Sequence, residues 1–223
     1  MKAYRFVHLN VHSHYSINDG CASIKELIDV AIKDKMPGIA ITDNGNMFGV
    51  MEFFDYVSRI NTERQEKGKR PFKPIFGCEM YVARRRMFNR DGKPDQSGYH
   101  LVVLAKNKKG YHNLIKLVSK AWTEGFYMRP RTDRVELEKY HEGLIVCSAC
   151  IAGEVPRKIL QGKLDEAEEA IQWYKRVFGS DFYLELQRHK ATVPKANHEA
   201  YGMQQIANEK IIELARKYDV KLV

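Results

Sequence analysis

Short apolar runs alternate with amphipathic segments along the whole chain. Some runs, such as Leu101–Leu104, are apolar throughout, which is typical of strands covered on both faces. The runs predict seven strands, at Phe6–Asn10, Gly38–Thr42, Ile75–Val82, His100–Ala105, Leu144–Ser148, Phe182–Gln187 and Val220–Val223. The segments between them predict helices at Ser23–Asp34, Phe48–Lys67, Lys109–Glu124, Glu154–Gln161, Leu164–Phe178 and His198–Tyr218. This alternation predicts an α/β fold with a parallel sheet, either open or closed into a barrel.

The composition favours a globular protein with a hydrophobic core over a membrane-spanning or disulfide-rich protein. The 223 residues are 44% hydrophobic, which is enough for a sizeable core. No apolar run approaches the roughly 20 residues that a membrane span needs, so we expect no membrane association. The four cysteines are too few for a disulfide scaffold and predict free thiols in a cytoplasmic protein. Cys147 and Cys150 form a C-x-x-C pair without a second pair, which is a weak zinc or redox signal.

Positive charge is concentrated in two stretches. The formal net charge is +9, and much of the excess lies in residues 64–73 and 84–93. The long, polar segment 84–98 is predicted to be a flexible loop. Such charge either remains solvated or faces a nucleic acid, and the sequence leaves both interpretations open.

Histidines and an amide alternate near the N-terminus. If the first strand continues far enough, His8, Asn10, His12 and His14 project from one face, because side chains of a strand alternate with period two. Such a face can line a metal or phosphate pocket, or it can simply be solvated. The remaining polar residues decide between these alternatives.

Candidate metal ligands follow or begin several predicted strands. His12 and Asp19 follow the first strand, Glu79 lies in the third, His100 begins the fourth and Cys150 follows the fifth. Ligand sites of α/β sheets gather at the carboxyl ends of strands, so we expect these side chains to converge. Each one alone has an ordinary explanation: Asp19 as a turn residue, His100 as a core histidine and Cys150 as packing. Glu79 is harder to explain in this way, because a buried carboxylate needs a partner.

Seven segments together resemble one known family. The chain is similar to the PHP (polymerase and histidinol phosphatase) domain of bacterial DNA polymerase III alpha subunits. The segments that carry the resemblance are Phe6–Gly20, Ala40–Gly49, Gly77–Ala83, Tyr99–Val102, Gly110–Leu117, Glu142–Val155 and Phe182–Gln187.

This resemblance implies a fold and a set of activities. It implies a distorted (β/α)7 barrel over residues 1–223, as the N-terminal part of a much longer subunit. The family implies a cluster of zinc or manganese ions, which in some members supports a 3′–5′ exonuclease. In other members the domain is a scaffold that docks against the polymerase core and a proofreading exonuclease subunit. The parent would be a DNA-directed DNA polymerase of chromosomal replication, a nucleotidyltransferase that uses magnesium and contacts DNA.

The chain departs from the family's ligand pattern. Asn10 and Asn44 stand where the family has histidines, and an amide is a weaker ligand than imidazole for zinc or manganese. The family's last ligand motif would follow Val223, so we expect the chain to be a fragment. The ligand positions that match are His12, Asp19, Glu79, His100 and Cys150.

Three functions therefore remain after the sequence is read. The first, which the two asparagines favour, is a non-catalytic scaffold with a degenerate metal site. The second is a residual metal-dependent exonuclease or phosphoesterase. The third is a nucleic-acid-binding module that uses the basic loops.

Overall fold

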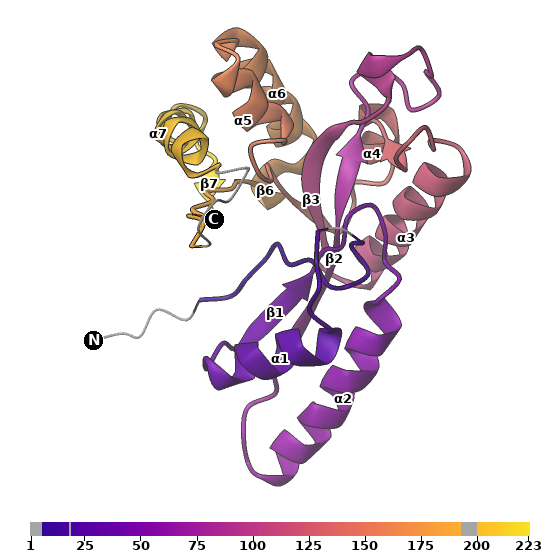
Figure 1. The fold of residues 1–223 in the computed structure, drawn as a ribbon, viewed down its shortest axis with the longest axis vertical. Coiled ribbons are helices and arrows are strands. Elements are labelled where there is room, and N and C mark those ends of the chain that lie inside the picture. The colour runs from indigo at the N-terminus through magenta and orange to yellow at the C-terminus, as the bar shows by residue number, and fades with distance from the viewer. Residues whose placement is uncertain (1–5, 18, 193–199) are drawn as a thin grey trace.

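A curled, mixed sheet of seven strands organises the chain (Figure 1). The computed structural model describes residues 6–17, 19–192 and 200–223. The strand order is β1-β2-β3-β5-β6-β7, and the short β4 pairs with β2. The sheet forms a half-barrel, in agreement with the predicted distorted (β/α)7 barrel. The strands are β1 (Gly38–Ile41), β2 (Lys73–Val82), β3 (Tyr99–Ala105), β4 (Arg131–Thr132), β5 (Leu144–Cys147), β6 (Phe182–Leu184) and β7 (Lys221–Leu222).

The helices lie close to the predicted segments. Six of them match the sequence pattern, whereas α4 and the short β4 were not predicted. Ser23 caps α1 in a capping box with Glu26. His198, at the predicted start of the last helix, lies outside the described residues. The helices are α1 (Ile24–Lys33), α2 (Val50–Glu66), α3 (Lys108–Thr123), α4 (Arg134–Lys139), α5 (Glu154–Leu160), α6 (Leu164–Phe178) and α7 (Tyr201–Tyr218), with 3-10 turns at Lys93–Asp95 and Gly179–Asp181.

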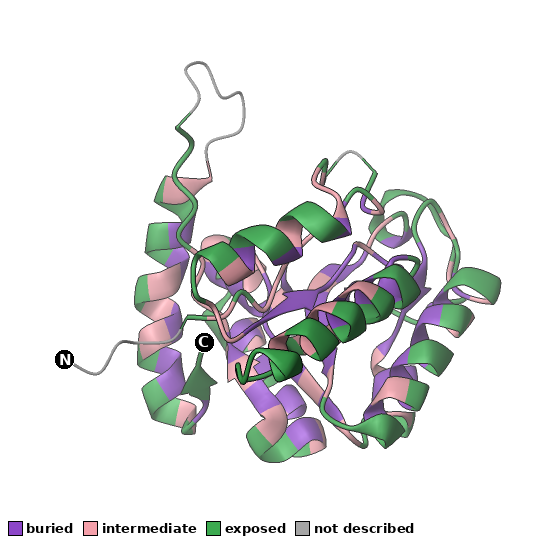
Figure 2. Cartoon of the chain, turned by 90° about the horizontal axis from the view of Figure 1, so that it is seen from below, coloured by how far each residue is buried: buried purple, intermediate pink, exposed green. Residues whose placement is uncertain are grey.

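Two apolar clusters hold the helices against the sheet. The larger one contains Leu117 of α3, Ile171 of α6 and Ile211 of α7, all at most 1% exposed. The smaller one joins α1 and α2 to β1 and includes Ile28 and Phe53. Figure 2 shows the buried faces of these helices turned toward the strands. No helix of the described part of the chain is long and apolar enough to cross a membrane.

The sheet is not parallel throughout, so that part of the prediction was wrong. β3 runs antiparallel to both β2 and β5, while β1–β2, β5–β6 and β6–β7 are parallel. The connection from β2 to β3 contains no α-helix that could serve as a crossover, and a parallel pair needs one. The amino end of β3 consequently lies beside the carboxyl end of β2, which brings His100 opposite Tyr81.

The predicted first strand is also absent from the described residues. Residues 6–12 run beside β1 in an irregular, extended path. The backbone amides of Ala40 and Thr42 donate to the carbonyls of His8 and Val11, at 3.0 and 2.9 Å. The Val11 amide instead donates to the Thr42 hydroxyl, at 2.8 Å. This side-chain substitution interrupts the ladder that a regular strand requires.

Hydrogen bonds and ion pairs hold the basic 84–98 loop in place. Arg85 pairs with the buried Asp95, and Arg86 pairs with Asp133 at 2.7 Å. The fully buried Arg131 donates to the carbonyls of Met87, Asn89 and Asp95 in the same loop. These contacts argue against the flexible loop that the sequence suggests, because they satisfy some of its charges and several of its carbonyl groups internally.

Candidate metal centre

Glu79 on β2 is the centre of the polar cluster. Its side chain is 2% exposed, and each of its two oxygens accepts a hydrogen bond from a different histidine. His100 Nδ1 lies 2.5 Å from Oε1, and His12 Nε2 lies 2.9 Å from Oε2. A carboxylate inside an apolar strand needs such partners, because an unpaired buried charge is strongly destabilising.

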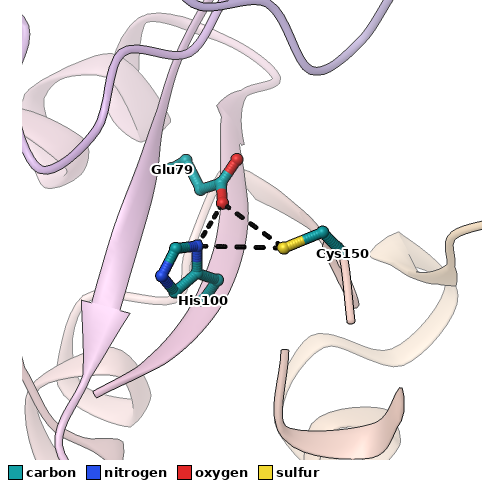
Figure 3. Close-up of side chains that lie close together, drawn as sticks. All are labelled: Glu79, His100 and Cys150. Carbon is teal, nitrogen blue, oxygen red and sulfur yellow. Dashed lines mark hydrogen bonds and ion pairs between the residues drawn. The ribbon is translucent and has the colours of Figure 1, made fainter. Parts of the chain in front are cut away.

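Cys150 completes a three-residue group with Glu79 and His100 (Figure 3). Its sulfur lies 3.9 Å from His100 Nδ1 and 4.0 Å from Glu79 Oε1. The backbone amide of Ala152 donates to the same sulfur at 3.4 Å. Cys150 follows β5 in a turn in which Ala149 adopts a positive φ of 60°. This turn directs the thiol toward β2 and β3.

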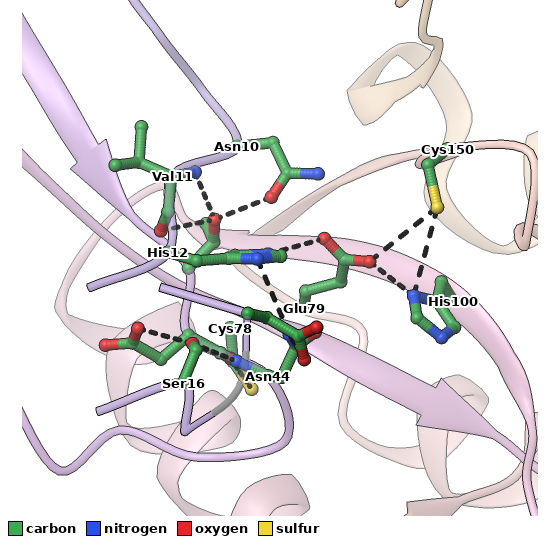
Figure 4. Close-up of polar contacts among 12 residues, drawn as sticks. Asn10, Val11, His12, Ser16, Asn44, Cys78, Glu79, His100 and Cys150 are labelled. Atoms are coloured by element: carbon green, nitrogen blue, oxygen red, sulfur yellow. Dashed lines mark hydrogen bonds and ion pairs between the residues drawn. The ribbon is translucent and has the colours of Figure 1, made fainter. Parts of the chain in front are cut away.

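His12 and Asn44 lie next to the first group (Figure 4), and they form a second polar group with Asp19. Asn44 Nδ2 donates to Asp19 Oδ2 at 3.0 Å and lies 3.4 Å from His12 Nδ1. The side-chain amide oxygen of Asn44, Oδ1, is buried and has no hydrogen-bond partner among the described residues. The amide therefore lies between an imidazole and a carboxylate that are both predicted metal ligands.

The charges of the first group are strongly coupled. Burial alone would raise the pKa of Glu79, but hydrogen bonds from His100 and then His12 outweigh it and lower the pKa to about 2. Burial alone would lower the pKa of His100, but the contacts with Cys150 and Glu79 outweigh it and raise the pKa to about 10. Without a metal, these two residues form a buried ion pair near neutral pH.

Asp43, next to Asn44, anchors the loop that carries His12. Its carboxylate accepts hydrogen bonds from the Ser13 amide at 2.7 Å and from the Ser16 hydroxyl at 2.6 Å. The Ser16 hydroxyl also accepts from the Asn44 amide at 3.0 Å. Asp43 was not among the predicted site residues. Its position one residue before Asn44 in a buried strand end was the available signal.

All five candidate ligands line one cavity of about 700 Å³. The structure therefore brings His12, Asp19, Glu79, His100 and Cys150 together, although their role as metal ligands stays a prediction. One wall of the cavity is apolar and includes Leu27, Val30, Ala31, Met36 and Ile39.

The alternation predicted for the N-terminal segment holds for only three of its four residues. His8, Asn10 and His12 line the cavity. His14 is exposed and packs against Tyr15, with ring centroids 4.4 Å apart. The period-two path ends because Ser13 and Ser16 tie the chain into a turn around Asp43.

Two half-buried groups near the centre, Glu185 and Asn10, were not among the predicted metal ligands. Glu185 follows β6, and burial raises its pKa despite opposing hydrogen bonds from Gln187 and Asn10. Asn10 also accepts from the Thr42 hydroxyl at 2.9 Å. Cys147, the other half of the C-x-x-C pair, is 1% exposed in the apolar core, so it does not act together with Cys150.

The donor set of the first group fits one metal ion. Carboxylate oxygen, imidazole nitrogen and thiolate are all ligands of zinc. The three donor atoms lie within 4.8 Å of one another. Small shifts would bring them to the spacing of about 3.3–3.8 Å that tetrahedral bonds of about 2.0–2.3 Å impose. The second group is less suitable, because the amide hydrogens of Asn44 face the positions where a cation would bind His12 and Asp19.

Comparison with known proteins agrees with this geometry. The family model described as "PHP domain" matches residues 8–189. A protein of Bifidobacterium adolescentis that has been proposed to be a metal-dependent phosphoesterase has a similar fold, with a TM-score of 0.52 and 14% sequence identity. That similarity covers 97% of this chain and 85% of the other, and at this identity it supports the fold alone.

Proteins related by sequence resemble this chain more closely than that structural neighbour does. The DNA polymerase III subunit alpha of Borreliella burgdorferi is 46% identical over 98% of this chain, and that of Treponema pallidum is 42% identical over 85%. The corresponding subunit of Thermus aquaticus is 38% identical over 98% of the chain. This chain spans only 16–17% of the length of these three relatives. The chain therefore belongs to the PHP domain family, and it is similar over nearly its whole length to bacterial DNA polymerase III alpha subunits.

Proposed function

We propose that this chain is the PHP domain, residues 1–223, of a replicative DNA polymerase III alpha subunit in the bacterial cytoplasm, and that the domain is a non-catalytic scaffold. The relatives are named as alpha subunits and align with nearly the whole chain. DNA-directed DNA synthesis and its magnesium ions would belong to the remaining polypeptide. The scaffold would support that polypeptide and a proofreading exonuclease subunit, and DNA would be bound through the parent protein.

The observation that carries the scaffold proposal is the contact of Asn44 with Asp19 and His12. Hydrolysis of a phosphodiester by clustered metals needs ions that activate water and neutralise the phosphate. Here an amide holds two of the candidate ligands, and Asn10 bonds to Thr42. The cluster is left with donors for a single zinc or manganese ion.

An exposed aromatic patch supports the scaffold role. Phe48, Trp122 and Phe126 are 61%, 40% and 44% exposed, and their rings follow one another at centroid distances of 5.7 and 5.6 Å. Neighbouring apolar groups of this kind mark interaction sites. The Trp122 indole donates to the carbonyl of Gly45 at 2.8 Å, which links the patch to the strand end that carries Asn44. We propose that the rest of the alpha-subunit polypeptide covers this patch.

A residual metal-dependent exonuclease or phosphoesterase is the second candidate. The group of Glu79, His100 and Cys150 favours it, because one ion can activate a water molecule there. His12 would then orient Glu79 through a hydrogen bond instead of binding the ion.

A nuclease assay separates these two candidates. The purified chain is incubated with end-labelled single-stranded DNA and manganese or zinc, with and without a chelator. The scaffold proposal predicts no degradation above that of the variant His12→Ala. Chelator-sensitive degradation that disappears in His12→Ala and persists in the exposed control variant His112→Ala would establish the nuclease instead.

The scaffold itself is tested in the complete alpha subunit. Trp122→Ser removes the centre of the aromatic patch at a residue that does not line the metal cavity, and we expect it to lower the thermal stability and DNA synthesis of the subunit. Phe88→Ser, which replaces an exposed aromatic residue outside the patch, is the matched control and should leave synthesis unchanged. Equal synthesis by the Trp122→Ser variant and the wild type would contradict the scaffold role of this patch.

A further inference from the structure

The basic stretch that follows α2 faces α1 across a groove. Helices α1 and α2 lie side by side at one end of the fold (Figure 1). The groove between them has a volume of about 580 Å³ and lies apart from the residues of the metal centre. Its charged lining consists of five basic and two acidic side chains, a net charge of +3: Lys25, Arg59, Arg64, Lys67 and Lys69, with Asp29 and Glu63.

Internal ion pairs do not account for this charge. Asp29 is already bound by Lys25 at 2.7 Å and by the Tyr56 hydroxyl at 2.7 Å. Within the part of the chain that the structure describes, Arg59, Lys67 and Lys69 have no ion-pair partner within 4.0 Å. The other long basic loop differs in part, because two of its five basic side chains, Arg85 and Arg86, are paired with carboxylates.

The backbone of this stretch is held in a fixed form. The Lys69 amide donates to the Arg64 carbonyl at 2.8 Å, and the Arg64 side chain donates to the Arg70 carbonyl at 2.8 Å. Asn61 bonds both backbone groups of Phe72, which anchors the end of the stretch in the core. Lys67 and Lys69 are thus presented from a preformed turn, so that little backbone ordering is needed when an anion binds.

An aromatic ring lies among these cations. The guanidinium carbon of Arg59 is 5.1 Å from the centroid of the Tyr56 ring, and Lys25 Nζ is 5.8 Å from it. Surfaces that bind single-stranded nucleic acid combine a positive groove, which follows the phosphates, with aromatic and guanidinium planes for the bases. A simple acidic peptide would use the charge but not the planar groups.

We propose that the groove between α1 and α2 binds the phosphate backbone of single-stranded nucleic acid. Arg59, Lys67 and Lys69 contact successive phosphates, and the neighbouring guanidinium of Arg59 and ring of Tyr56 face a base. This site stands on the charge and shape of the groove and does not depend on the metal centre or on the scaffold role.

Fluorescence anisotropy with a labelled oligo(dT) of about 16 nucleotides tests the site, since this length covers a single-strand binding site of ordinary size. The triple variant Arg59→Ala, Lys67→Ala, Lys69→Ala should bind roughly tenfold more weakly at low salt. Its plot of log affinity against log salt should be shallower by about 2, because each lost phosphate contact contributes about 0.7.

The matched control removes the same three charges elsewhere, as Lys108→Ala, Lys139→Ala, Arg176→Ala. These side chains are exposed and lie on α3, α4 and α6. The control should bind as the wild type does, with the same salt slope. Equal weakening by both triple variants, no binding by the wild-type chain, or binding of poly-glutamate as tight as that of oligo(dT) would each overturn the proposal. Circular dichroism confirms that both variants are folded.

Discussion

The side chain of Asn44 donates a hydrogen bond to the carboxylate of Asp19, at 3.0 Å. A metal ion bound to this oxygen, Oδ2, would have to displace the amide, whose hydrogens face it. The same nitrogen lies 3.4 Å from His12 Nδ1, so one amide faces two candidate ligands. Asn44 thus divides the polar lining of the cavity into two parts. In one part, Asn44 holds His12 and Asp19 by hydrogen bonds. The other part, around Glu79 and Cys150, keeps donor atoms for a metal ion.

This division makes a prediction about metal content. We expect the wild-type chain to bind at most one zinc or manganese ion, and the double variant Asn10→His, Asn44→His to bind more, because imidazole is the stronger ligand. Elemental analysis after dialysis against buffered metal measures the ratio of metal to chain. Asn44→Ala is the control, since it removes the amide without supplying a ligand, and it should gain no ion. Two or more ions on the wild-type chain would show that Asn44 does not block the second position.

Cys150 is predicted to be a direct ligand of the remaining ion. Cobalt(II), substituted for zinc, should show a sulfur-to-metal charge-transfer band that Cys150→Ser abolishes. The variant should also weaken metal binding by at least about tenfold, the lower end of the loss seen when even an outer-shell group is removed. Cys21→Ser is the matched control, because Cys21 is exposed and does not line the cavity. Retention of the band in the Cys150→Ser chain would exclude this thiolate from the site.

The geometry of this centre was only partly predictable from the sequence. The five candidate residues could be placed near strand ends, because apolar runs such as Leu101–Leu104 define the strands well. The direction of β3 could not be read from these runs, since a fully buried strand has the same pattern in both orientations. His100 nevertheless reaches the site, because an antiparallel β3 puts its amino end beside the carboxyl end of β2.

Hydrogen bonds between distant residues account for most of what the sequence did not indicate. The bond from Asn44 to Asp19 spans 25 positions, and the bond from Ser13 to Asp43 spans 30. The hydrophobic periodicity of a sequence does not indicate pairs that lie so far apart along the chain. The short α4 was missed for a different reason: its six residues are too few to establish a helical period, and its start depends on the cap formed by Asp133.

The pairing of Glu79 with His100 predicts how the metal-free chain responds to pH. The pKa of Glu79 falls from 4.5 to about 2, so its contribution to stability is present above pH 4.5 and is lost as the pH falls toward 2. The pKa of His100 rises from 6.5 to about 10, so its contribution is present below pH 6.5 and is lost as the pH rises toward 10. Both contributions are complete only between pH 4.5 and 6.5.

The variant Glu79→Gln tests this dependence in chelator-treated protein. At pH 5.5 we expect a loss of about 3 kcal/mol in the free energy of unfolding, the lower end for breaking a buried pair, measured by urea denaturation. The loss should shrink toward both extremes of pH. Glu138→Gln, on an exposed side chain of α4, should follow the wild-type profile. A constant difference between Glu79→Gln and wild type across the pH range would contradict the ion pair.

Asp133 is predicted to stabilise the fold independently of the metal centre. Its carboxylate is 1% exposed and accepts hydrogen bonds from Arg86 at 2.7 Å and from the Met87 amide at 2.9 Å. Its other oxygen caps α4 by accepting from the Glu136 amide at 3.0 Å. One side chain thus ties the 84–98 loop to the start of a helix. Without it, the buried backbone amides of Met87 and Glu136 would lose their hydrogen-bond acceptor.

We expect Asp133→Ala to lower the free energy of unfolding by about 2–4 kcal/mol, because it removes a cap and leaves buried donors without acceptors. Urea denaturation monitored by circular dichroism measures the change. Asp133→Asn keeps one acceptor oxygen and should lose less. Asp91→Ala is the control, since Asp91 pairs with Arg85 in the same loop but is largely exposed, and exposed pairs contribute little. Unfolding of Asp133→Ala and Asp91→Ala at the same urea concentration would contradict this prediction. The buried hydrogen bonds of Asp133 would then not hold the loop, and the 84–98 segment would be as flexible as its sequence suggests.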